Sequence, residues 1–288
     1  MPASLAMVAS ALFFSLMGVC VKQVGTRIPA TEVVLARAVV SVVLSWWMLR
    51  RAGIAPWGQR RGLLIWRGAI GTLALLCVYQ ALAMLPLAAA TVLQYSYPTF
   101  TALLAWLSLG EPVGPRLLGA VALGWMGVMV LAWPPAGAEL GTSLPPLAVA
   151  IALVGAFSTA LAYVSVRALR HSEHPLVIVF YFPLVGLVLT LPLVALQPVW
   201  PTAWEVLALV GVGLFTQLGQ IGVTKGLLGM PAGRATAMSY GQVPLAALWG
   251  WWFFREPLDP DTAVAAGLVL AATLLSLRRS PPSRAADR

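Results

Sequence analysis

Two clusters of polar side chains lie inside apolar stretches of the sequence, and each cluster surrounds a proline. The members are Gln94, Tyr95, Ser96, Tyr97 and Thr99 around Pro98, and Ser239, Tyr240 and Gln242 before Pro244. Proline cannot donate a hydrogen bond to the carbonyl four residues earlier, so the carbonyls of Gln94 and Tyr240 are expected to be free. Free carbonyls beside hydroxyls, amides and aromatic rings suit a small zwitterionic or neutral solute.

Further polar residues on other apolar stretches extend this candidate site. The predicted substrate-binding residues are Tyr79, Gln94, Tyr95, Ser96, Tyr163, Gln217, Tyr240 and Gln242, with helix breaks at Pro98 and Pro244. Polar residues at membrane depth are costly, which makes them functional candidates. The alternative is that they only hydrogen-bond between helices, each contributing about 1 kcal/mol.

The sequence lacks the residue patterns of an enzyme or a metal site. His171 and His174, with Glu173 between them, lie in one short polar segment before Pro175 and have no third ligand pattern. Ser15 has no basic partner nearby in the sequence. We therefore expect no catalytic residues, no metal and no cofactor.

The charged residues favour a carrier that is not coupled to protons. Every Asp and Glu lies near the end of an apolar stretch or in the C-terminal tail, whereas a proton relay normally needs a carboxylate or histidine at mid-membrane depth. Arg37 lies about a turn and a half inside its stretch, where it can snorkel outward or point into a cavity; we expect snorkelling. Arg67 is taken as a marker of the cytoplasmic side.

These residues must be positioned by membrane-spanning helices, because the chain is too apolar for water. It is 60% hydrophobic and 9% charged, with a mean hydropathy of +0.89. A span needs about 20 mostly apolar residues. Ten stretches qualify, approximately at 3–21, 32–49, 63–84, 88–108, 114–133, 146–168, 175–196, 203–224, 232–254 and 260–277.

The basic residues set the expected orientation. With a cytoplasmic N-terminus, fourteen of the 18 Lys and Arg residues fall on the inside, which the positive-inside rule favours. Both termini are then cytoplasmic in a bacterial-type inner membrane. The net charge of +9 does not predict nucleic-acid binding, because the basic residues form no continuous patch.

The two halves of the chain resemble each other in order and spacing. Phe14-Ser15 matches Phe157-Ser158, Pro98 matches Pro244, and a Glu-Pro pair at 111–112 matches another at 256–257. Each half has five spans, an odd number, so the second half must enter the membrane with opposite polarity. The sequence predicts an all-α polytopic membrane protein of two inverted-topology five-helix repeats at 1–135 and 136–280, followed by a cytoplasmic tail at 281–288.

The ten spans as five plus five, the segment Tyr79-Gln80-Ala81-Leu82 before Pro86, and the repeated Glu-Pro pair resemble the drug/metabolite transporter superfamily, EamA type. Within it the chain looks most like amino-acid exporters of the YddG type. The resemblance implies export of amino acids or related metabolites through a central cavity lined by spans one to four and six to nine. The second half has Thr224-Lys225-Gly226-Leu227 at the place of the first segment, so no role is carried over from Tyr79.

The function expected from the sequence is export of a small metabolite, foremost aromatic or other neutral amino acids, by alternating access. A multidrug or other metabolite permease of the same fold, or a membrane scaffold without transport, are the alternatives. The expected partners are the small-molecule substrate and the lipid bilayer. Stripes of small residues, such as Ala120 and Gly124, are compatible with a monomer or a weak homodimer.

The predicted orientation can be tested by cysteine labelling in a background without Cys20 and Cys77. Thr26→Cys should react with a membrane-impermeant thiol reagent added outside the cell, and Arg284→Cys should react only when the reagent reaches the cytoplasm. External labelling at position 284 would overturn the orientation.

Overall fold

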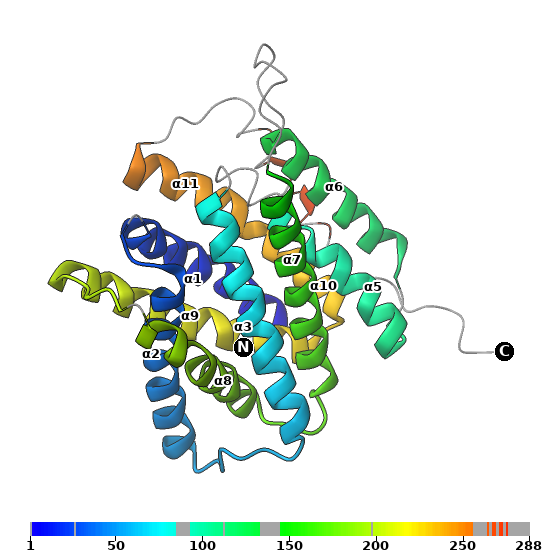
Figure 1. Ribbon diagram of the computed structural model, residues 1–288. Helices are drawn as coiled ribbons and strands as arrows, with labels where there is room; N and C mark the ends of the chain where they lie inside the picture. Colours follow the sequence, from blue (N-terminus) through cyan, green and yellow to red (C-terminus); the bar gives the residue numbers. More distant parts are fainter. Residues whose placement is uncertain are drawn as a thin grey trace.

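A computed structural model describes residues 2–25, 27–84, 93–111, 113–132, 145–196 and 198–255, together with six single residues between 264 and 275. Within these residues every regular element is helical. The helices are α1 (Ala3–Val24), α2 (Ala30–Ala52), α3 (Arg61–Met84), α5 (Tyr97–Leu109), α6 (Pro115–Ala132), α7 (Pro146–Ala168), α8 (Pro175–Leu196), α9 (Ala203–Gly229), α10 (Ala232–Met238), the 3₁₀ turn η1 (Ser239–Gly241) and α11 (Gln242–Phe254). Figure 1 shows them packed as one bundle.

The prediction of an all-helical membrane protein is confirmed. Among the described residues, α1, α2, α3, α7, α8 and α9 are long and apolar enough to cross a membrane. The expected fourth span is represented by the shorter α5, and the ninth by α10, η1 and α11 in succession. Most of the expected tenth span, at 260–277, lies outside the described residues.

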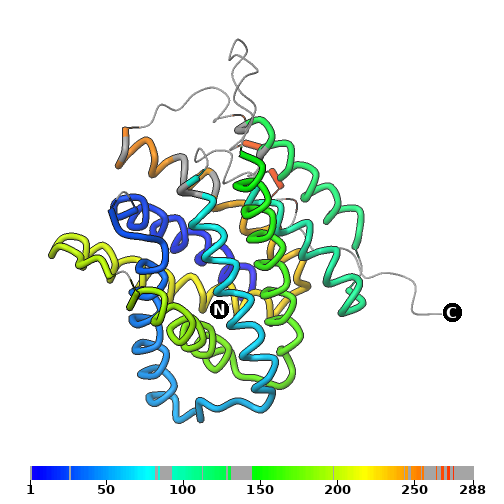
Figure 2. The backbone as a smooth tube through the Cα atoms, in the orientation of Figure 1, coloured from blue at the N-terminus to red at the C-terminus, as the bar shows by residue number. Residues whose placement is uncertain are grey.

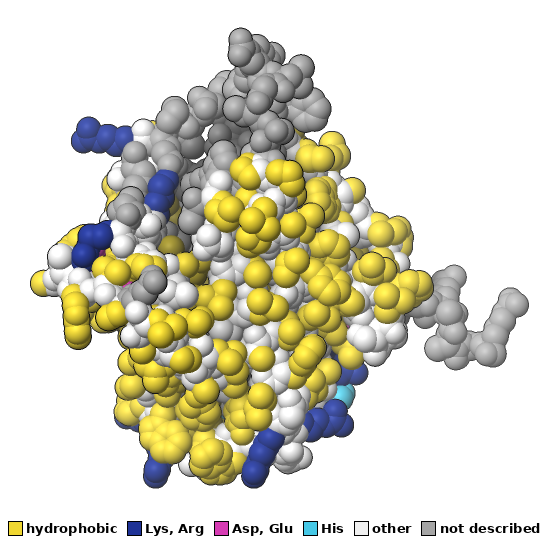
Figure 3. Space-filling view, in the orientation of Figure 1, with side chains coloured by type: hydrophobic (Ala, Val, Ile, Leu, Met, Phe, Trp, Pro, Cys, Tyr) yellow, Lys and Arg dark blue, Asp and Glu magenta, His cyan; other side chains and the backbone are white. Residues whose placement is uncertain are grey.

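The surface of the bundle is apolar, as a lipid environment requires. Large hydrophobic side chains such as Leu107 and Val188 are each 65% exposed. In Figure 3 hydrophobic side chains cover the middle of the visible face, and most Lys and Arg side chains lie toward its edges. Lipid replaces water as the solvent of this face.

Contacts between the two halves of the chain come in reciprocal pairs. The first helix of each half packs against the third helix of the other half: α1 against α9, and α7 against α3. The second helix of each half also packs against the third helix of the other half: α2 against α9, and α8 against α3. In the same way, the contact of α1 with α11 corresponds to the contact of α7 with α5. In the tube view of Figure 2 helices from both halves interleave through the bundle.

Small residues allow the closest of these helix contacts. A Cβ atom added to Gly222 of α9 would lie 2.6 Å from the Ala6 carbonyl oxygen of α1, and one added to Gly226 would lie 2.2 Å from the Met7 sulfur. Without water to drive apolar groups together, helices in a membrane associate through such close packing. Glycines in α9 therefore bring α1 and α9 together.

In each half, the segment that connects the second and third helices is bound by a carboxylate from the other half. Glu173, just before α8, accepts hydrogen bonds from the backbone N–H groups of Gln59 at 2.6 Å and Arg60 at 2.5 Å, at the start of α3. Glu32, in the first turn of α2, accepts one from the N–H of Val199 before α9. Each acid thus satisfies backbone donors that would otherwise be unpaired near a helix start.

A third carboxylate, Glu111, joins three helices beside the end of α7. Its Oε1 accepts a hydrogen bond from Arg167 Nε at 2.6 Å, and its Oε2 accepts one from the N–H of Ala232 at 2.7 Å. Arg167 Nη1 also donates to the carbonyl of Leu228 at 2.9 Å. Only 11% of each charged side chain is exposed, so this network links α5, α7, α9 and α10 largely out of solvent.

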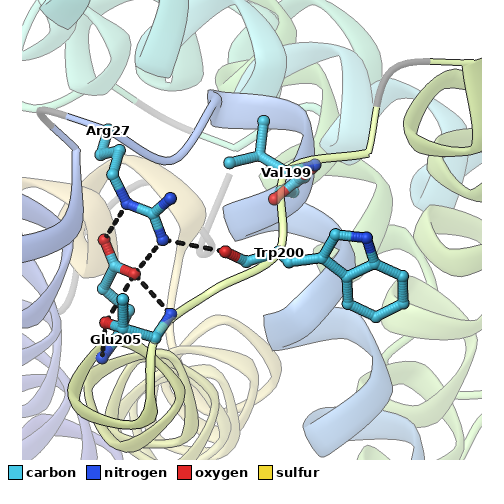
Figure 4. A network of polar contacts seen from close by, with 6 residues as sticks. Arg27, Val199, Trp200 and Glu205 are labelled. Carbon is cyan, nitrogen blue, oxygen red and sulfur yellow. Dashed lines mark hydrogen bonds and ion pairs between the residues drawn. The ribbon is translucent and has the colours of Figure 1, made fainter.

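Another network, shown in Figure 4, joins the segment after α1 to the start of α9. Arg27 Nε donates to Glu205 Oε1 at 2.7 Å, and Arg27 Nη2 donates to the Trp200 carbonyl at 2.9 Å. Glu205 and Thr202 form a capping box at the start of α9. The hydrogen bond to Glu205 raises the pKa of the Arg27 guanidinium. The side chain of Arg27 is 47% exposed, whereas that of Glu205 is 12% exposed.

We expect the two networks to differ sharply in their contribution to stability. Glu111→Ala should lower the free energy of unfolding by roughly 3 kcal/mol, because it leaves Arg167 charged and largely buried without its partner. Arg27→Ala should change it little, because exposed ion pairs contribute little. Thermal unfolding of both variants in the same detergent compares them; equal melting temperatures would contradict the role assigned to Glu111.

Candidate functional site

Both predicted polar clusters lie at interruptions in their helices. Residues 95–96 form a turn, and α5 begins at Tyr97 with Pro98 in its first turn, where the missing N–H of proline costs no helical hydrogen bond. In the second half the 3₁₀ turn η1 separates α10 from α11, and Pro244 lies in the first turn of α11. The interruptions therefore come just before the two prolines.

Four tyrosines from both halves form a continuous array at these interruptions, which we call the tyrosine array. Tyr95 stacks on Tyr240 with ring centroids 5.8 Å apart, and it also contacts Tyr97 at 6.0 Å. The edge of Tyr163, from α7, meets Tyr97 at 5.6 Å. The Tyr240 hydroxyl donates to the Tyr95 carbonyl at 3.3 Å. The array thus joins α5, α7 and η1.

The structure brings three of the predicted residues, Tyr95, Tyr163 and Tyr240, into this array. Gln94 lies next to it, and its Nε2 donates to Thr159 Oγ1 of α7 at 3.4 Å while its Oε1 has no partner. Ser96 donates to the carbonyl of Leu93 within its own turn. Gln242 begins α11 and is partly buried.

Gln217 and Tyr79 lie on other helix contacts. Gln217 of α9 donates from Nε2 to Ser45 Oγ of α2 at 2.7 Å, so it joins these two helices. Tyr79 of α3 is buried, and its hydroxyl has no hydrogen-bond partner. The hydroxyl is nevertheless close enough to Arg37 to interact electrostatically with its guanidinium.

Two arginines lie in the interior of the bundle, which the sequence did not predict. Arg37 is 4% exposed and Arg67 is 1% exposed. Their guanidinium carbons lie 4.9 and 3.9 Å from the ring centroid of Phe182 on α8. The expectation that Arg37 snorkels outward is wrong, and Arg67 is not a surface marker of the cytoplasmic side. We call Arg37, Arg67 and Phe182 the arginine centre.

The arginine centre lies near the tyrosine array, because the Tyr163 hydroxyl is within electrostatic range of both guanidinium groups. Two hydroxyls on helices that border the centre, Ser41 of α2 and Thr216 of α9, are buried without hydrogen-bond partners. Buried polar groups are usually paired. Both hydroxyls therefore keep unused hydrogen-bonding capacity.

The arginine centre fits tightly between α3 and α8. A Cβ atom added to Gly71, one turn after Arg67, would lie 2.7 Å from Arg67 Nη1 and 2.8 Å from Phe182 Cε2. Gly68 faces Val185 of α8 in the same way, with a Cβ distance of 2.7 Å to the Val185 Cβ. Glycines in α3 therefore leave the space that the guanidinium and the ring occupy.

Phe182 alone does not compensate the two charges. A cation–π contact contributes about 2 kcal/mol when it is desolvated. Removing one unpaired charge from water costs several kcal/mol, and two like charges within about 9 Å of each other repel in addition. Arg67 Nε and Nη1 have no hydrogen-bond acceptor at all. The arginine centre is therefore electrostatically incomplete among the described residues.

The feature of the sequence that could have indicated a buried Arg67 is its position within an apolar stretch. At 1.5 Å per residue, Arg67 lies about 9 Å along α3 from its first residue, and Arg37 lies about 10 Å along α2. Both depths allow a long side chain to reach either the interface or the interior. Hydropathy cannot separate the two possibilities, because the rotation of each helix about its axis decides between them.

A surface hollow of about 530 Å³ lies near the start of α8, and it is lined by Ala3, Pro175, Lys225, Leu228 and Gly229. Phe182 follows two turns further along α8. Metal binding is a separate question. The described residues hold no group of His, Cys, Asp or Glu side chains that could bind a metal ion. The interior of the bundle contains aromatic rings, hydroxyls and two guanidinium groups.

Comparison with known proteins identifies the family. Residues 1–133 and 146–278 each match the model of the EamA-like transporter family, which shows a duplicated domain. A solved crystal structure is similar with a TM-score of 0.82 over 96% of each chain at 18% identity, which supports the fold alone.

Among curated proteins, the pseudopaline exporter CntI of Pseudomonas aeruginosa is 30% identical over 95% of this chain and 94% of its own length. Solute carrier family 35 member G1 of Homo sapiens is also 30% identical, over 86% of this chain and 71% of its own length. A probable transport protein of Saccharomyces cerevisiae is 27% identical over 86% of this chain. The chain is thus a multi-pass membrane transporter and not an enzyme, and it belongs to the EamA-like transporter family within the drug/metabolite transporter superfamily.

Proposed function

We propose that this protein exports a small, amino-acid-like metabolite across a bacterial-type inner membrane, and that the solute binds at the tyrosine array. The observation that carries the proposal is the composition of that array. Tyr95 and Tyr97 come from the first half of the chain, and Tyr163 and Tyr240 come from the second. A solute held there contacts both halves, so movement of one half against the other changes its exposure.

The helix interruptions support binding at this place. Backbone at mid-membrane depth departs from a regular helix only where its polar groups are satisfied by protein or face a cavity. The turn at 95–96 and the 3₁₀ turn η1 meet in the array, where the Tyr240 hydroxyl already uses the Tyr95 carbonyl as an acceptor. That hydrogen bond is one that a solute can replace.

The reciprocal contacts between halves support alternating access by an inverted repeat. Because α1 packs on α9 as α7 packs on α3, the two halves can exchange conformations and open the site first to one side and then to the other. Glu32 and Glu173 make matching contacts near the two ends of the bundle. These contacts are suitable points for gates.

The relatives support export of a small metabolite. One of them, at 30% identity over nearly the whole chain, is named an exporter. None of the described carboxylates lies at the array, so the proposed transport runs down the gradient of the solute.

Reconstitution into liposomes tests this proposal. Liposomes preloaded with radiolabelled phenylalanine, leucine, glutamate or aspartate should release at least one of them faster than protein-free liposomes do. Tyr95→Phe, Tyr240→Phe, Gln94→Ala and Gln242→Ala should raise the half-saturation concentration, with changes at positions from both halves, because the solute loses hydrogen bonds in each.

Ser108→Ala is the matched control, since Ser108 is exposed on α5 and bonds only to its own helix. Its kinetics should equal those of the unmodified protein. Normal half-saturation and maximal rate in all four array variants would move the site elsewhere, and release of none of the four amino acids would refute the amino-acid assignment.

A further inference from the structure

We propose that the arginine centre is an anion site, and that the transported solute is a small organic carboxylate with a net negative charge rather than a neutral amino acid. This inference deepens the proposed function and rests on the same interior of the bundle. It is carried by two buried guanidinium groups that converge on one ring, Phe182, from α2 and α3.

The first step is that the described residues offer Arg67 no hydrogen-bond acceptor for two of its donors, so a bound ligand can supply one. The side chain is 1% exposed, and its Nε and Nη1 donors have no acceptor. Unpaired donors on a buried cation are rare in folded proteins, because both charge and hydrogen bonds are left unsatisfied. A carboxylate offers two acceptor oxygens in the geometry of the guanidinium fork.

The second step is the lack of a counter-charge among the described residues. The four carboxylates that the structure describes are Glu32, Glu111, Glu173 and Glu205, and each already bonds elsewhere near an end of the helices. Arg37 and Arg67 therefore leave two positive charges together in the interior. A neutral zwitterion brings no net charge to balance them, whereas an anion does.

The third step is the character of the surroundings, which favours an organic anion. Phe182 presents aromatic surface to both guanidinium groups. The Tyr163 hydroxyl lies within electrostatic range of both groups, and the Tyr79 hydroxyl lies near Arg37. Sites for organic ligands combine apolar surface with a few polar groups in this way. Inorganic phosphate would leave the aromatic surface unused.

The burial of Arg37 and Arg67 favours a small soluble anion over a lipid headgroup. Arg67 lies about 9 Å along α3 from its first residue, and Arg37 lies about 10 Å along α2 from its first residue. Because both guanidinium carbons lie close to one ring, they are within about 9 Å of each other. A small soluble molecule with one or two carboxylates can contact both, whereas a headgroup is held at the surface.

The test measures binding by thermal unfolding of the purified full-length protein in detergent. The probes are succinate, glutarate, citrate and glutamate as anions, phenylalanine and leucine as zwitterions, and inorganic phosphate. At least one carboxylate anion should raise the melting temperature at concentrations where both zwitterions and phosphate do not. Arg37→Gln and Arg67→Gln should each weaken that binding by about tenfold or more, the contribution of a charge-assisted hydrogen bond.

Arg51→Gln is the matched control, because Arg51 lies at the end of α2 against Trp47 and away from the arginine centre. It should bind the carboxylate as the unmodified protein does. Equal stabilisation by zwitterions and anions, stronger stabilisation by phosphate than by any carboxylate, or unchanged binding in both Gln variants would each overturn the proposal.

A second measurement needs no ligand. Arg67→Met keeps most of the volume of the side chain and removes the uncompensated charge, so the empty protein should melt at a higher temperature than the unmodified protein. If Arg67 instead served only to hold the helices together, the same variant would melt at a lower temperature. That result would overturn the assignment even if no probe in the panel bound.

Two glycine substitutions in α3 test how tightly Arg67 and Phe182 are packed. Gly71→Ala places a methyl group against Arg67 and Phe182 and should weaken carboxylate binding, although alanine favours a helix more than glycine does. Gly62→Ala, on the same helix with open space around it, should leave binding unchanged. Equal binding by both variants would contradict the packing described for the arginine centre.

The inference and the proposed function can fail separately. Binding of carboxylates that depends on Arg37 and Arg67, without release of any solute from liposomes, would refute transport and retain the anion site. Release of phenylalanine or leucine that is unchanged in both arginine variants would refute the anion site and retain export.

Discussion

Hydrocarbon around the bundle cannot solvate a charge, so every charged group in the interior must be balanced by something the protein or its solute provides. The described carboxylates are used near the ends of the helices, where they bind backbone donors and arginines such as Arg167. Arg37 and Arg67 are left inside, with one aromatic ring between α2, α3 and α8. This imbalance of charge gives the interior its preference for an anion.

The use of the carboxylates near the helix ends also explains how the helices are held together while the arginine centre can accept a ligand. Glu32 and Glu173 bind connections of the opposite half, and Glu111 joins α5 to α7 and α10. These contacts order the ends of the bundle and hold the carboxylates away from Arg37 and Arg67. If an acid were placed beside Arg67, the centre would be satisfied internally and would lose its affinity for an external carboxylate.

The tyrosine array and the arginine centre lie near each other at Tyr163, which contacts Tyr97 and is within electrostatic range of both arginines. The array brings residues of both halves together at two interrupted helices, and the centre brings charge. A solute with an anionic group and an apolar part can contact both at once. Movement of the halves would then break some of these contacts and release it, which is the physical requirement of alternating access.

The sequence by itself determined the membrane environment, the placement of most helices and the duplication, because hydropathy and order along the chain are local properties. The predicted stretches at 146–168 and 175–196 coincide with α7 and α8. Tyr95, Tyr163 and Tyr240 were recognised from their polar character in apolar stretches, whereas Tyr97 was seen in the cluster and left out of the predicted set. Only the tertiary structure decided that Arg37 and Arg67 point inward to one ring, since that depends on how α2, α3 and α8 are rotated about their axes and on the space that Gly71 leaves.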